Sequence, residues 1–351
     1  MQSLKAAGRG AAHLEAAFHE AAARASVEER SFRIGGHHVL LRFAGPGVVP
    51  FITPAFGHLA FAPAAEPELV VDIWDSASTG VQPPATPEVE SDLPPGGFYF
   101  FEDPPMHGVF QPRIQALSIL DLGIDHAWYW VADPLGLPYW ERAAPIRHIL
   151  HWWMATRGHQ KAHSAAVGTP EGGVLLVGKG GSGKSTSSLI SLVSDLRYAG
   201  DDYTMVSLEP RPWVHSLFSS GKVEPHNLSR LPHLRPALSN AGQLETEKAL
   251  VFIDQHFPDR PIDGFPLRAI MLPRITGERH TRAVPTSGAA ALAALAPSTV
   301  FQLAGAGREA LQLMAGLARE VPAYVLELGR DVSEIPRVIL DLLDQLRAAA
   351  P

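Results

Sequence analysis

The residues best suited to chemistry lie in a glycine-rich stretch near the middle of the chain. The stretch consists of Gly178, Lys179, Gly180, Gly181, Ser182, Gly183, Lys184, Ser185 and Thr186. A glycine, four residues, a second glycine, a lysine and a serine form the pattern of a phosphate-binding loop, or P-loop, whose backbone N–H groups surround phosphate oxygens. Lys184 would neutralise the β- and γ-phosphates, and the Ser185 hydroxyl would bind Mg²⁺. The pattern predicts that this loop binds a nucleotide, and it does not distinguish ATP from other nucleotides.

The residues on either side of the loop favour this interpretation. Residues 174–177 form an apolar run typical of a buried strand, and residues 184–193 have the spacing of a helix. A strand that enters the loop and a helix that leaves it form the structural context of a P-loop. The alternative is a glycine-rich turn that binds nothing, and these flanks disfavour it.

Two adjacent acids, Asp201 and Asp202, follow a predicted strand at residues 198–200. In an open α/β sheet the ligand crevice lies at the carboxyl ends of the strands, so this position suits a catalytic pair. One carboxylate would help to hold magnesium, and the other would accept the proton of an attacking hydroxyl group. A solvated turn is the alternative for an arbitrary Asp-Asp pair, but the P-loop upstream favours the catalytic interpretation.

Length and composition limit the classes of protein to consider. The 351 residues suggest two domains, and 46% hydrophobic against 19% charged residues indicates a chain that buries large cores. A formal charge of −7 gives no general attraction to polyanions, so nucleic acid is not an expected partner. The sequence has no cysteine, which excludes disulfides and Cys-ligated metals, and no apolar run reaches membrane-spanning length. We therefore expect a cytoplasmic protein without a membrane partner.

Residues 1–140 are expected to form a β-rich α+β domain, with substrate recognition as its default role and a purely structural scaffold as the alternative. The predicted strands are 31–33, 38–43, 69–74, 98–101, 113–120 and 127–131, after an alanine-rich helical start. A proline-rich loop is expected at residues 81–97. Apolar positions 146, 149, 150 and 153 then show helical spacing, which places the domain boundary near residue 140.

Residues 141–351 have the pattern of an α/β domain around the P-loop. The predicted strands are 164–167, 173–177, 198–200, 204–208, 267–272 and 323–328, and the predicted helices are 184–193, 287–295, 308–318 and 332–348. The connection at residues 228–248, with its prolines and glycine, is the best candidate for a mobile loop that faces the substrate. The histidines at positions 148, 151, 159 and 163 lack metal-binding spacing, so no histidine metal site is expected.

Together these motifs resemble a known family, HPr kinase/phosphorylase, a bacterial protein-serine kinase whose P-loop domain is related to phosphoenolpyruvate carboxykinase. The resemblance covers about residues 162–208 and is carried by residues 163–167, the P-loop and residues 199–202. In the family a histidine opens the strand fifteen residues before the first P-loop glycine, as His163 does here. The paired aspartates begin seventeen residues after the P-loop lysine, as Asp201 does here. The implied fold is an α/β P-loop kinase core.

The resemblance also implies roles for individual residues. Asp201 would be the base that activates the acceptor hydroxyl, while Asp202 and Ser185 would serve magnesium. His163 would orient the aspartate from the neighbouring strand, and the two aspartates could exchange their roles. Lys222 would meet the charge of the transferring phosphoryl group, with an exposed loop lysine as the alternative. Apart from the resemblance, one member of a scattered basic group is a candidate for contact with phosphate or with an acidic tail of the substrate, with solvated surface as the alternative for most of them: Arg260, Arg268, Arg274, Arg279 and Arg282.

By resemblance the chain would be an ATP- and Mg²⁺-dependent kinase that phosphorylates a hydroxyl group, with a serine of a peptide or protein as the expected acceptor. Some HPr-kinase-like proteins accompany ribosomally made peptides, including lasso peptides, and phosphorylate a serine of the precursor. The chain lacks the family's Pro-Gly-Arg-Asn stretch, so docking of HPr and the reverse phosphorylase reaction are not implied. The alternatives are a small-molecule kinase, acting on a sugar or another metabolite, and a nucleotide-gated binding module without catalysis. The resemblance leaves room for a homo-oligomer.

Overall fold

The computed structural model describes residues 10–84, 86, 93, 96–300, 304, 305 and 307–349. The chain divides into an N-terminal unit, Met1–Pro54 and Leu59–Thr156, and a C-terminal unit, Ala55–His58 and Arg157–Pro351. The boundary between the two units follows Thr156, later than the boundary expected near residue 140, because helix α6 (Arg147–Ala155) packs on the N-terminal sheet. Much of the proline-rich loop expected at 81–97 lies outside the described residues.

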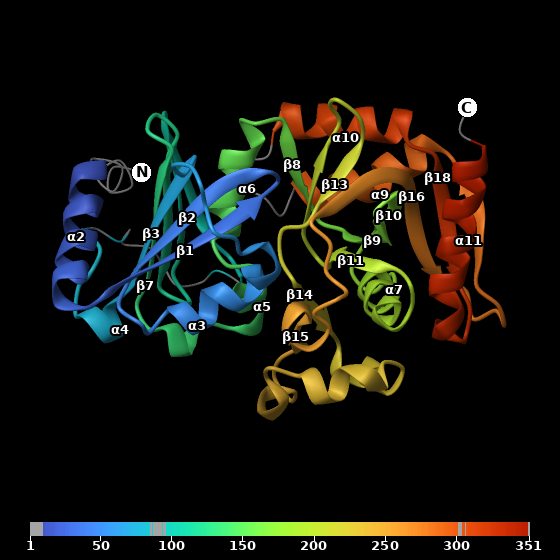
Figure 1. The fold of residues 1–351 in the computed structure, drawn as a ribbon, viewed down its shortest axis with the longest axis horizontal. Helices are drawn as coiled ribbons and strands as arrows, with labels where there is room; N and C mark the ends of the chain where they lie inside the picture. Colours follow the sequence, from blue (N-terminus) through green and yellow to red (C-terminus); the bar gives the residue numbers. More distant parts are fainter. Residues whose placement is uncertain are drawn as a thin grey trace. The chain divides into compact units, whose positions relative to one another are not determined.

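In the described part of the N-terminal unit, seven strands form one sheet in the order β1-β2-β3-β7-β6-β5-β4 (Figure 1). They are β1 (Val27–Ile34), β2 (His37–Ala44), β3 (Leu69–Asp75), β4 (Tyr99–Asp103), β5 (Met106–Gln111), β6 (Ala116–Asp121) and β7 (His126–Val131). β2, β3 and β7 run parallel, and the other pairs are antiparallel. The sequence analysis missed β5, whose apolar run is short and interrupted by a glycine.

Helix α2 (Ala11–Arg24) covers one face of this sheet. Its buried side chains, Leu14, Phe18 and Ala21, share a core with Trp74 and Trp130 of the strands. The alanine-rich start of the chain was expected to be helical, and α2 confirms that expectation for residues 11–24. The unit also contains the short α-helical segments α3 (Val49–Ile52), α4 (Ser76–Thr79) and α5 (Tyr139–Ala143). No helix among the residues described here is both long and apolar enough to cross a membrane.

The C-terminal unit contains a mixed sheet with the main path β11-β9-β10-β16-β13-β12-β8, and β18 pairs with both β16 and β17. The strands are β8 (His159–Ala162), β9 (Ala165–Thr169), β10 (Gly172–Leu176), β11 (Arg197–Gly200), β12 (Thr204–Ser207), β13 (Trp213–His215), β16 (Gly264–Ile275), β17 (Arg282–Thr286) and β18 (Ala323–Leu328). Among the strands that the structure describes here, β10, β16 and β18 pair in parallel and the other pairs are antiparallel, so the alternating α/β order expected from the sequence holds for these three strands.

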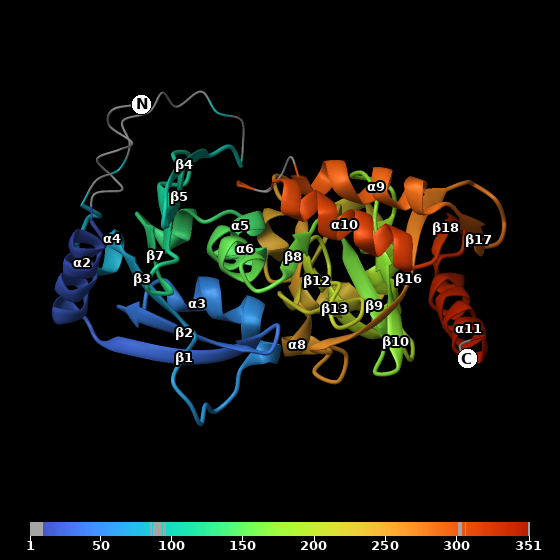
Figure 2. The ribbon, with the colours of Figure 1, turned by 90° about the horizontal axis from the view of Figure 1, so that it is seen from above.

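Helices cover both faces of this sheet (Figures 1 and 2). Val174 and Leu176 of β10 join the core beneath α7 (Lys184–Ile190) and α11 (Ile335–Ala348). The alternate residue, Leu175, joins the core beneath α9 (Gly288–Val300) and α10 (Arg308–Glu320). This alternation of side chains along a strand buries both faces of β10 and fixes the direction in which the strand enters the P-loop.

A separate hairpin of β14 (Ser220–Val223) and β15 (Ala249–Phe252) projects beside α7. The loop between its strands contains the 3-10 helices η4 (Pro225–Ser229), η5 (Pro232–Ala237) and η6 (Ala241–Gln243). Asn240, only 4% exposed, closes the loop: its side chain donates to Lys248 O at 2.8 Å and accepts from Leu250 N at 2.8 Å. The segment predicted as a mobile loop at 228–248 therefore contains 3-10 helices and buried polar anchors.

A four-residue segment from the first half of the sequence, Ala55–His58, belongs to the C-terminal unit. Ser219 N donates to Ala55 O at 2.8 Å, and the ring of Phe56 lies 5.3 Å from the ring of Phe218. His58 Nε2 and the Ser216 hydroxyl lie 2.6 Å apart. The segment thus anchors the residues that lead directly into β14.

The pH dependence of stability tests the anchor at His58. Burial lowers the pKa of its imidazole from 6.5 to about 3, so the folded protein binds a proton here less readily than the unfolded chain. The contribution of neutral His58 to the free energy of unfolding is fully present above pH 6.5, and it is lost as the pH falls toward 3. Between about pH 7.5 and 5 we expect the free energy of unfolding in urea to fall by about 1–2 kcal/mol more in the wild type than in His58→Gln. Equal slopes in the two proteins would contradict this expectation.

Candidate active site

The P-loop connects the end of β10 to the first turn of α7. Its backbone conformation favours glycine, because Gly181 has a φ of +78° and Gly183 a φ of +108°, both in the left-handed region. The hydroxyl of Ser182 is buried and has no hydrogen-bond partner among the described residues. A glycine-rich backbone with such an unpaired hydroxyl group suits an anionic ligand that carries several oxygens.

A substitution at Gly183 tests the shape of the loop. A Cβ at this position would lie 2.4 Å from Cδ1 of Leu328, in addition to the strain of the positive φ. We expect Gly183→Ala to lower the free energy of unfolding by about 2–4 kcal/mol. Gly180→Ala is the matched control, because its Cβ would meet no atom within 4 Å and Gly180 has no positive φ. Urea unfolding of both variants measures the difference. Equal free energies of unfolding would show that the loop accommodates a Cβ at position 183 without strain.

The P-loop lysine is held against the loop itself. Lys184 Nζ donates to Gly178 O at 2.6 Å and to Lys179 O at 3.3 Å, and the residue is only 7% exposed. Burial lowers the pKa of its ammonium group, whereas the negative charges of Asp201 and Asp202 oppose that shift. The lysine therefore places a cation at the floor of the loop, where phosphate oxygens can replace the two carbonyl groups.

Strand pairing brings the predicted histidine and aspartates together. Thr204 of β12 lies opposite Ala162 of β8 in the antiparallel register, which places Asp202 and His163 at the same end of these two strands. His163 Nε2 lies 2.8 Å from Asp202 Oδ1. The sequence analysis paired His163 with an aspartate, and the structure identifies Asp202 as that aspartate.

Asp202 has an unusual backbone and a strongly polar environment. Its φ is +70°, a left-handed conformation that aspartate tolerates better than most residues. Lys222 Nζ donates to Asp202 Oδ2, on the other side of the carboxylate from His163. Burial by itself would raise the pKa of Asp202, but the charge of Lys222 and the hydrogen bonds from His163 and Lys222 outweigh it and hold the pKa well below its usual range. Asp202 is thus an ionised carboxylate between His163 and Lys222.

Asp201, the preceding residue, is buried and has different neighbours. It is 3% exposed, and its Oδ2 accepts a hydrogen bond from Lys222 N at 3.2 Å. Burial and the neighbouring charge of Asp202 raise its pKa, while hydrogen bonds from Lys222 N and the Ser185 hydroxyl oppose the rise. Asp201 is therefore next to the P-loop serine, whereas Asp202 is next to His163 and Lys222.

Two residues that the sequence analysis did not single out complete this end of the site. The ring of Tyr203 lies beneath two cations, with Lys161 Nζ 4.7 Å and Lys222 Nζ 5.9 Å from its centroid. Lys161 is fully buried on β8. The aromatic face helps to keep the Lys222 ammonium next to Asp202. No pattern in the sequence links these positions, because the sheet and the β14–β15 hairpin assemble them.

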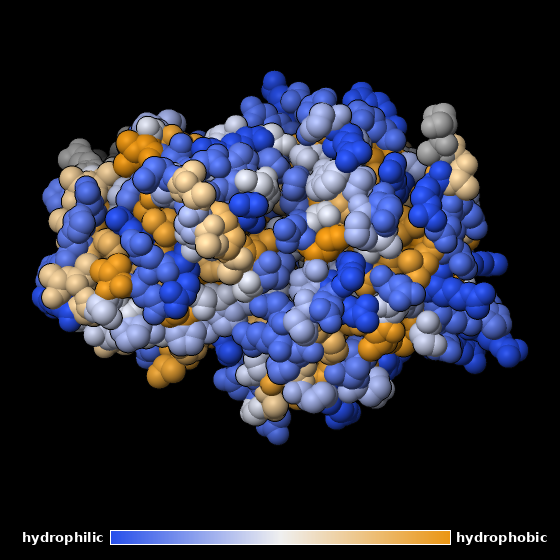
Figure 3. Space-filling model, in the orientation of Figure 1, coloured by the Kyte–Doolittle hydropathy of each residue, from blue (hydrophilic) through white to orange (hydrophobic). Residues whose placement is uncertain are grey.

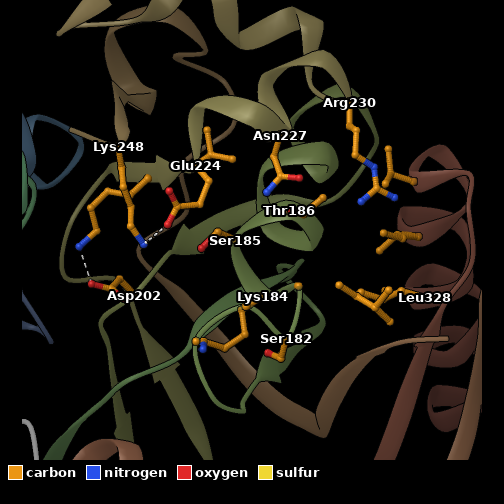
Figure 4. A pocket seen from close by; sticks show the side chains of 18 of the residues that line it. Ser182, Lys184, Ser185, Thr186, Asp202, Glu224, Asn227, Arg230, Lys248 and Leu328 are labelled. Atoms are coloured by element: carbon orange, nitrogen blue, oxygen red, sulfur yellow. Dashed lines mark hydrogen bonds and ion pairs between the residues drawn. The ribbon is translucent and has the colours of Figure 1, made fainter. Parts of the chain in front are cut away.

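A cavity of about 280 Å³ extends from this cluster across the P-loop (Figure 4). It is lined by His163, Asp202 and Lys222, by P-loop residues from Gly180 to Thr186, by Glu224, Asn227, Arg230 and Lys248 of the hairpin loop, and by Ile275, Leu328, Val332 and Ile335. Arg230 and Lys248 belong to the loop that was predicted to face the substrate, whereas Glu224, Asn227 and the apolar residues were not singled out from the sequence. Lys248 Nζ and Glu224 Oε1 form an ion pair at 2.9 Å between the two ends of that loop.

The arginines proposed as phosphate contacts lie elsewhere. Arg274 and Arg282 both form ion pairs with Glu327, and Arg268 donates to the carbonyl oxygen of Glu171. Arg260 donates to the carbonyl oxygen of Ser194. None of the five predicted arginines lines the cavity next to the P-loop. The structure therefore does not place any of the five next to the phosphate site, whereas Arg230 lines the cavity among the residues that the structure describes.

The oxygen donors next to the P-loop fit a hard cation that is held partly by a nucleotide. No group of three or more His, Cys, Asp or Glu side chains is arranged to hold a metal ion in the part of the chain that the structure describes. Magnesium usually takes one or two protein oxygens and completes its shell with phosphates and water. The Ser185 hydroxyl and the Asp201 carboxylate, whose buried Oδ1 has no partner of good hydrogen-bond geometry among these residues, supply such oxygens.

Comparison with known proteins does not show a family for this chain. No family model matches the sequence, and no curated protein does. Among solved structures, the chain matches the Hpr(Ser) kinase/phosphatase from Coxiella burnetii with a TM-score of 0.30 and 12% sequence identity, over 54% of this chain and 97% of that one. The described protein is a mixed α/β protein with several sheets, and its functional assignment depends on the geometry of the site.

Proposed function

We propose that this protein is an ATP- and Mg²⁺-dependent kinase that transfers the γ-phosphoryl group to a hydroxyl, with a serine of a peptide or protein as the acceptor. The observation that carries the proposal is the composition of a single cavity, in which the P-loop and Lys184 adjoin an ionised Asp202 hydrogen-bonded to His163. A site that only bound nucleotide would have no use for an oriented carboxylate beside the phosphates. The likeness of residues 162–208 to HPr kinase/phosphorylase supports the same reaction class.

We assign the two aspartates the reverse of the roles first suggested by the sequence. Asp202 lines the cavity and contacts His163, so it is the carboxylate that an acceptor hydroxyl can reach. Asp201 is buried beside Ser185, the residue that holds magnesium in P-loop enzymes. Asp201 and Ser185 would therefore hold the metal, which when bound neutralises charge on the β- and γ-phosphates.

Each residue of the site has a separate role in phosphoryl transfer. The P-loop N–H groups and Lys184 hold the triphosphate, and His163 and Lys222 fix the carboxylate of Asp202. The acceptor oxygen forms a bond to the γ-phosphorus as the bond from phosphorus to the β-γ bridging oxygen breaks, which releases ADP. Asp202 accepts the hydroxyl proton. Although its pKa is low, a weak base suffices, because in a loose transition state there is little bond formation to the attacking oxygen.

Two other functions remain as alternatives with different acceptors. A small-molecule kinase would use the same residues on a sugar or another metabolite. A nucleotide-gated binding module would bind ATP without transfer, which the oriented carboxylate disfavours. We assign recognition of the acceptor peptide to the N-terminal unit, and a ribosomally made peptide, such as a lasso peptide precursor, is the acceptor class to test first.

Mass spectrometry of candidate acceptors tests the proposal. The protein is incubated with Mg²⁺, ATP and each member of a panel: serine-containing peptides encoded next to its gene, the same peptides with the serine replaced by alanine, and common sugars. A gain of one phosphoryl group on a serine peptide, absent from the alanine peptide, supports a peptide kinase. Phosphorylation of a sugar alone would replace it with a small-molecule kinase, and ATP binding with no phosphorylated product would favour the binding module.

A further inference from the structure

We infer that the segment Ala55–His58 is a positioning element of the phosphoryl-transfer site, because it joins the two ends of the β14–β15 hairpin and thereby fixes where the hairpin places Lys222. The inference deepens the proposed function and rests on it. The chain leaves the N-terminal unit after Pro54 and returns to it at Leu59. None of the four residues between is among the described residues that line the cavity, so they would act through the hairpin.

The segment holds the end of the hairpin that leads into β14. Ala55 O accepts a hydrogen bond from Ser219 N at 2.8 Å, and the ring centroid of Phe56 lies 5.3 Å from that of Phe218. Phe56 is 0% and Phe218 1% exposed, so both rings are fully enclosed. A backbone hydrogen bond and a buried ring pair thus fix the chain three and four residues before Lys222.

The same segment contacts the end of the hairpin that leaves β15. A Cβ placed on Gly57 would lie 2.1 Å from Oδ2 of Asp254, so the absence of a side chain lets the segment come this close. Asp254 Oδ1 accepts from the Ser219 hydroxyl at 2.6 Å, and Ile253 N donates to Ser219 O at 2.8 Å. Ser219 is therefore bonded to both ends of the hairpin and to Ala55.

The hairpin carries this geometry to the reacting groups over a short distance. Lys222 N donates to Asp201 Oδ2 at 3.2 Å and its ammonium group donates to Asp202, so one residue of β14 contacts both aspartates. A Cβ on Gly221 would lie 2.5 Å from Leu189 of α7, so β14 has no space to move toward that helix. Blue predominates on the outer surface of the hairpin loop (Figure 3), which offers little apolar area for another contact to fix the hairpin. A shift at the residues before β14 would therefore move Lys222 relative to Asp202.

Turnover by full-length variants tests the inference, measured as transfer from labelled ATP to the member of the acceptor panel that the wild type phosphorylates. In Gly57→Ala the new Cβ meets the Asp254 carboxylate, and we expect turnover to fall about tenfold or more, since a misplacement of about 1 Å can cost 10²-fold. The KM for ATP should stay within about threefold of the wild type, because the P-loop is not part of the hairpin. Gly242→Ala is the matched control, since Gly242 lies in the hairpin loop and its Cβ would meet no atom within 4 Å.

A double substitution separates positioning from a general loss of stability. Asp254→Ala removes the carboxylate that the new Cβ would meet, so in this background Gly57→Ala should lower turnover less than about twofold. Urea unfolding shows whether each variant is folded under the assay conditions. Ser219→Ala deletes one hydroxyl group from the same link and keeps the test decisive if Gly57→Ala does not fold. We expect it to lower turnover about threefold.

The possible results distinguish this inference from the proposed function. Wild-type turnover in both Gly57→Ala and Ser219→Ala would overturn the positioning role and leave the kinase assignment intact. An equal loss from Gly57→Ala with and without the Asp254 carboxylate, or an equal loss in Gly242→Ala, would overturn it as well. A rise in the KM for ATP without a fall in turnover would show that the segment acts on nucleotide binding instead. If the wild type phosphorylates no member of the panel, the proposed function fails and the inference fails with it.

Discussion

Asp202→Asn is expected to slow phosphoryl transfer at least about 100-fold while nucleotide binding remains. The amide keeps the shape of the side chain and can still hydrogen-bond to His163, but it cannot accept the proton of the acceptor hydroxyl. Loss of a general base costs about 10²- to 10⁴-fold in turnover. The affinity for MgATP should stay the same or rise slightly, because one negative charge near the triphosphate is removed. Initial rates with labelled ATP and calorimetric titration measure the two effects separately.

Asp201→Asn provides the matched comparison for this prediction. The two substitutions remove the same charge from adjacent residues, but Asp201 faces Ser185 rather than the cavity. We expect this variant to need more Mg²⁺ for binding and turnover, whereas Asp202→Asn should keep the wild-type Mg²⁺ requirement. If instead Asp201→Asn lost turnover with an unchanged Mg²⁺ requirement, the original assignment of Asp201 as the base would be restored.

Lys184→Ala is expected to remove nucleotide binding and turnover together. The ammonium group at the floor of the P-loop donates to two loop carbonyls, and a triphosphate would take their place. A hydrogen bond between charged groups contributes about 1.5–3 kcal/mol, so ATP should bind about 10- to 100-fold more weakly. Turnover should fall by a further 10²-fold or so, since Lys184 also meets the charge that develops during transfer.

Arg337→Ala controls for the general loss of a positive charge. The side chain of Arg337 is 86% exposed on α11 and does not line the cavity. Its removal should leave ATP affinity and turnover at wild-type values in a direct binding titration. ATP affinity that is unchanged in Lys184→Ala would contradict the assignment of the loop as the phosphate site.

The local features of the C-terminal unit could be predicted from the sequence because they depend on short patterns. The strand before the P-loop and the helix after it follow from an apolar run, the glycines and the lysine, and the structure contains both as β10 and α7. β18 occupies the predicted residues 323–328. In contrast, β14 and β15 are four residues each and lie 25 residues apart, so neither has a periodic signal that a sequence would reveal.

The assembly of the site depends on long-range pairing, which is why its details differ from the prediction. Lys222 reaches Asp202 through the β14–β15 hairpin, and His163 reaches it through the register of β8 with β12. Two neighbouring aspartates look alike in a sequence, and only the backbone turn at Asp202, with its φ of +70°, directs one into the cavity and the other toward Ser185. The apolar residues that line the cavity range from Ile275 to Ile335, and no local pattern in the sequence marks them as parts of one surface.

Phosphorus NMR of ATP, Mg²⁺ and a serine peptide with the protein tests the central claim most directly, because one spectrum distinguishes transfer, hydrolysis and simple binding. The account predicts that the γ-phosphate signal disappears as ADP and a phosphate monoester appear in equal amounts, with none of this in Asp202→Asn. Release of inorganic phosphate alone, at the same rate in the wild type and in Asp202→Asn, would contradict a kinase that uses Asp202 as its base.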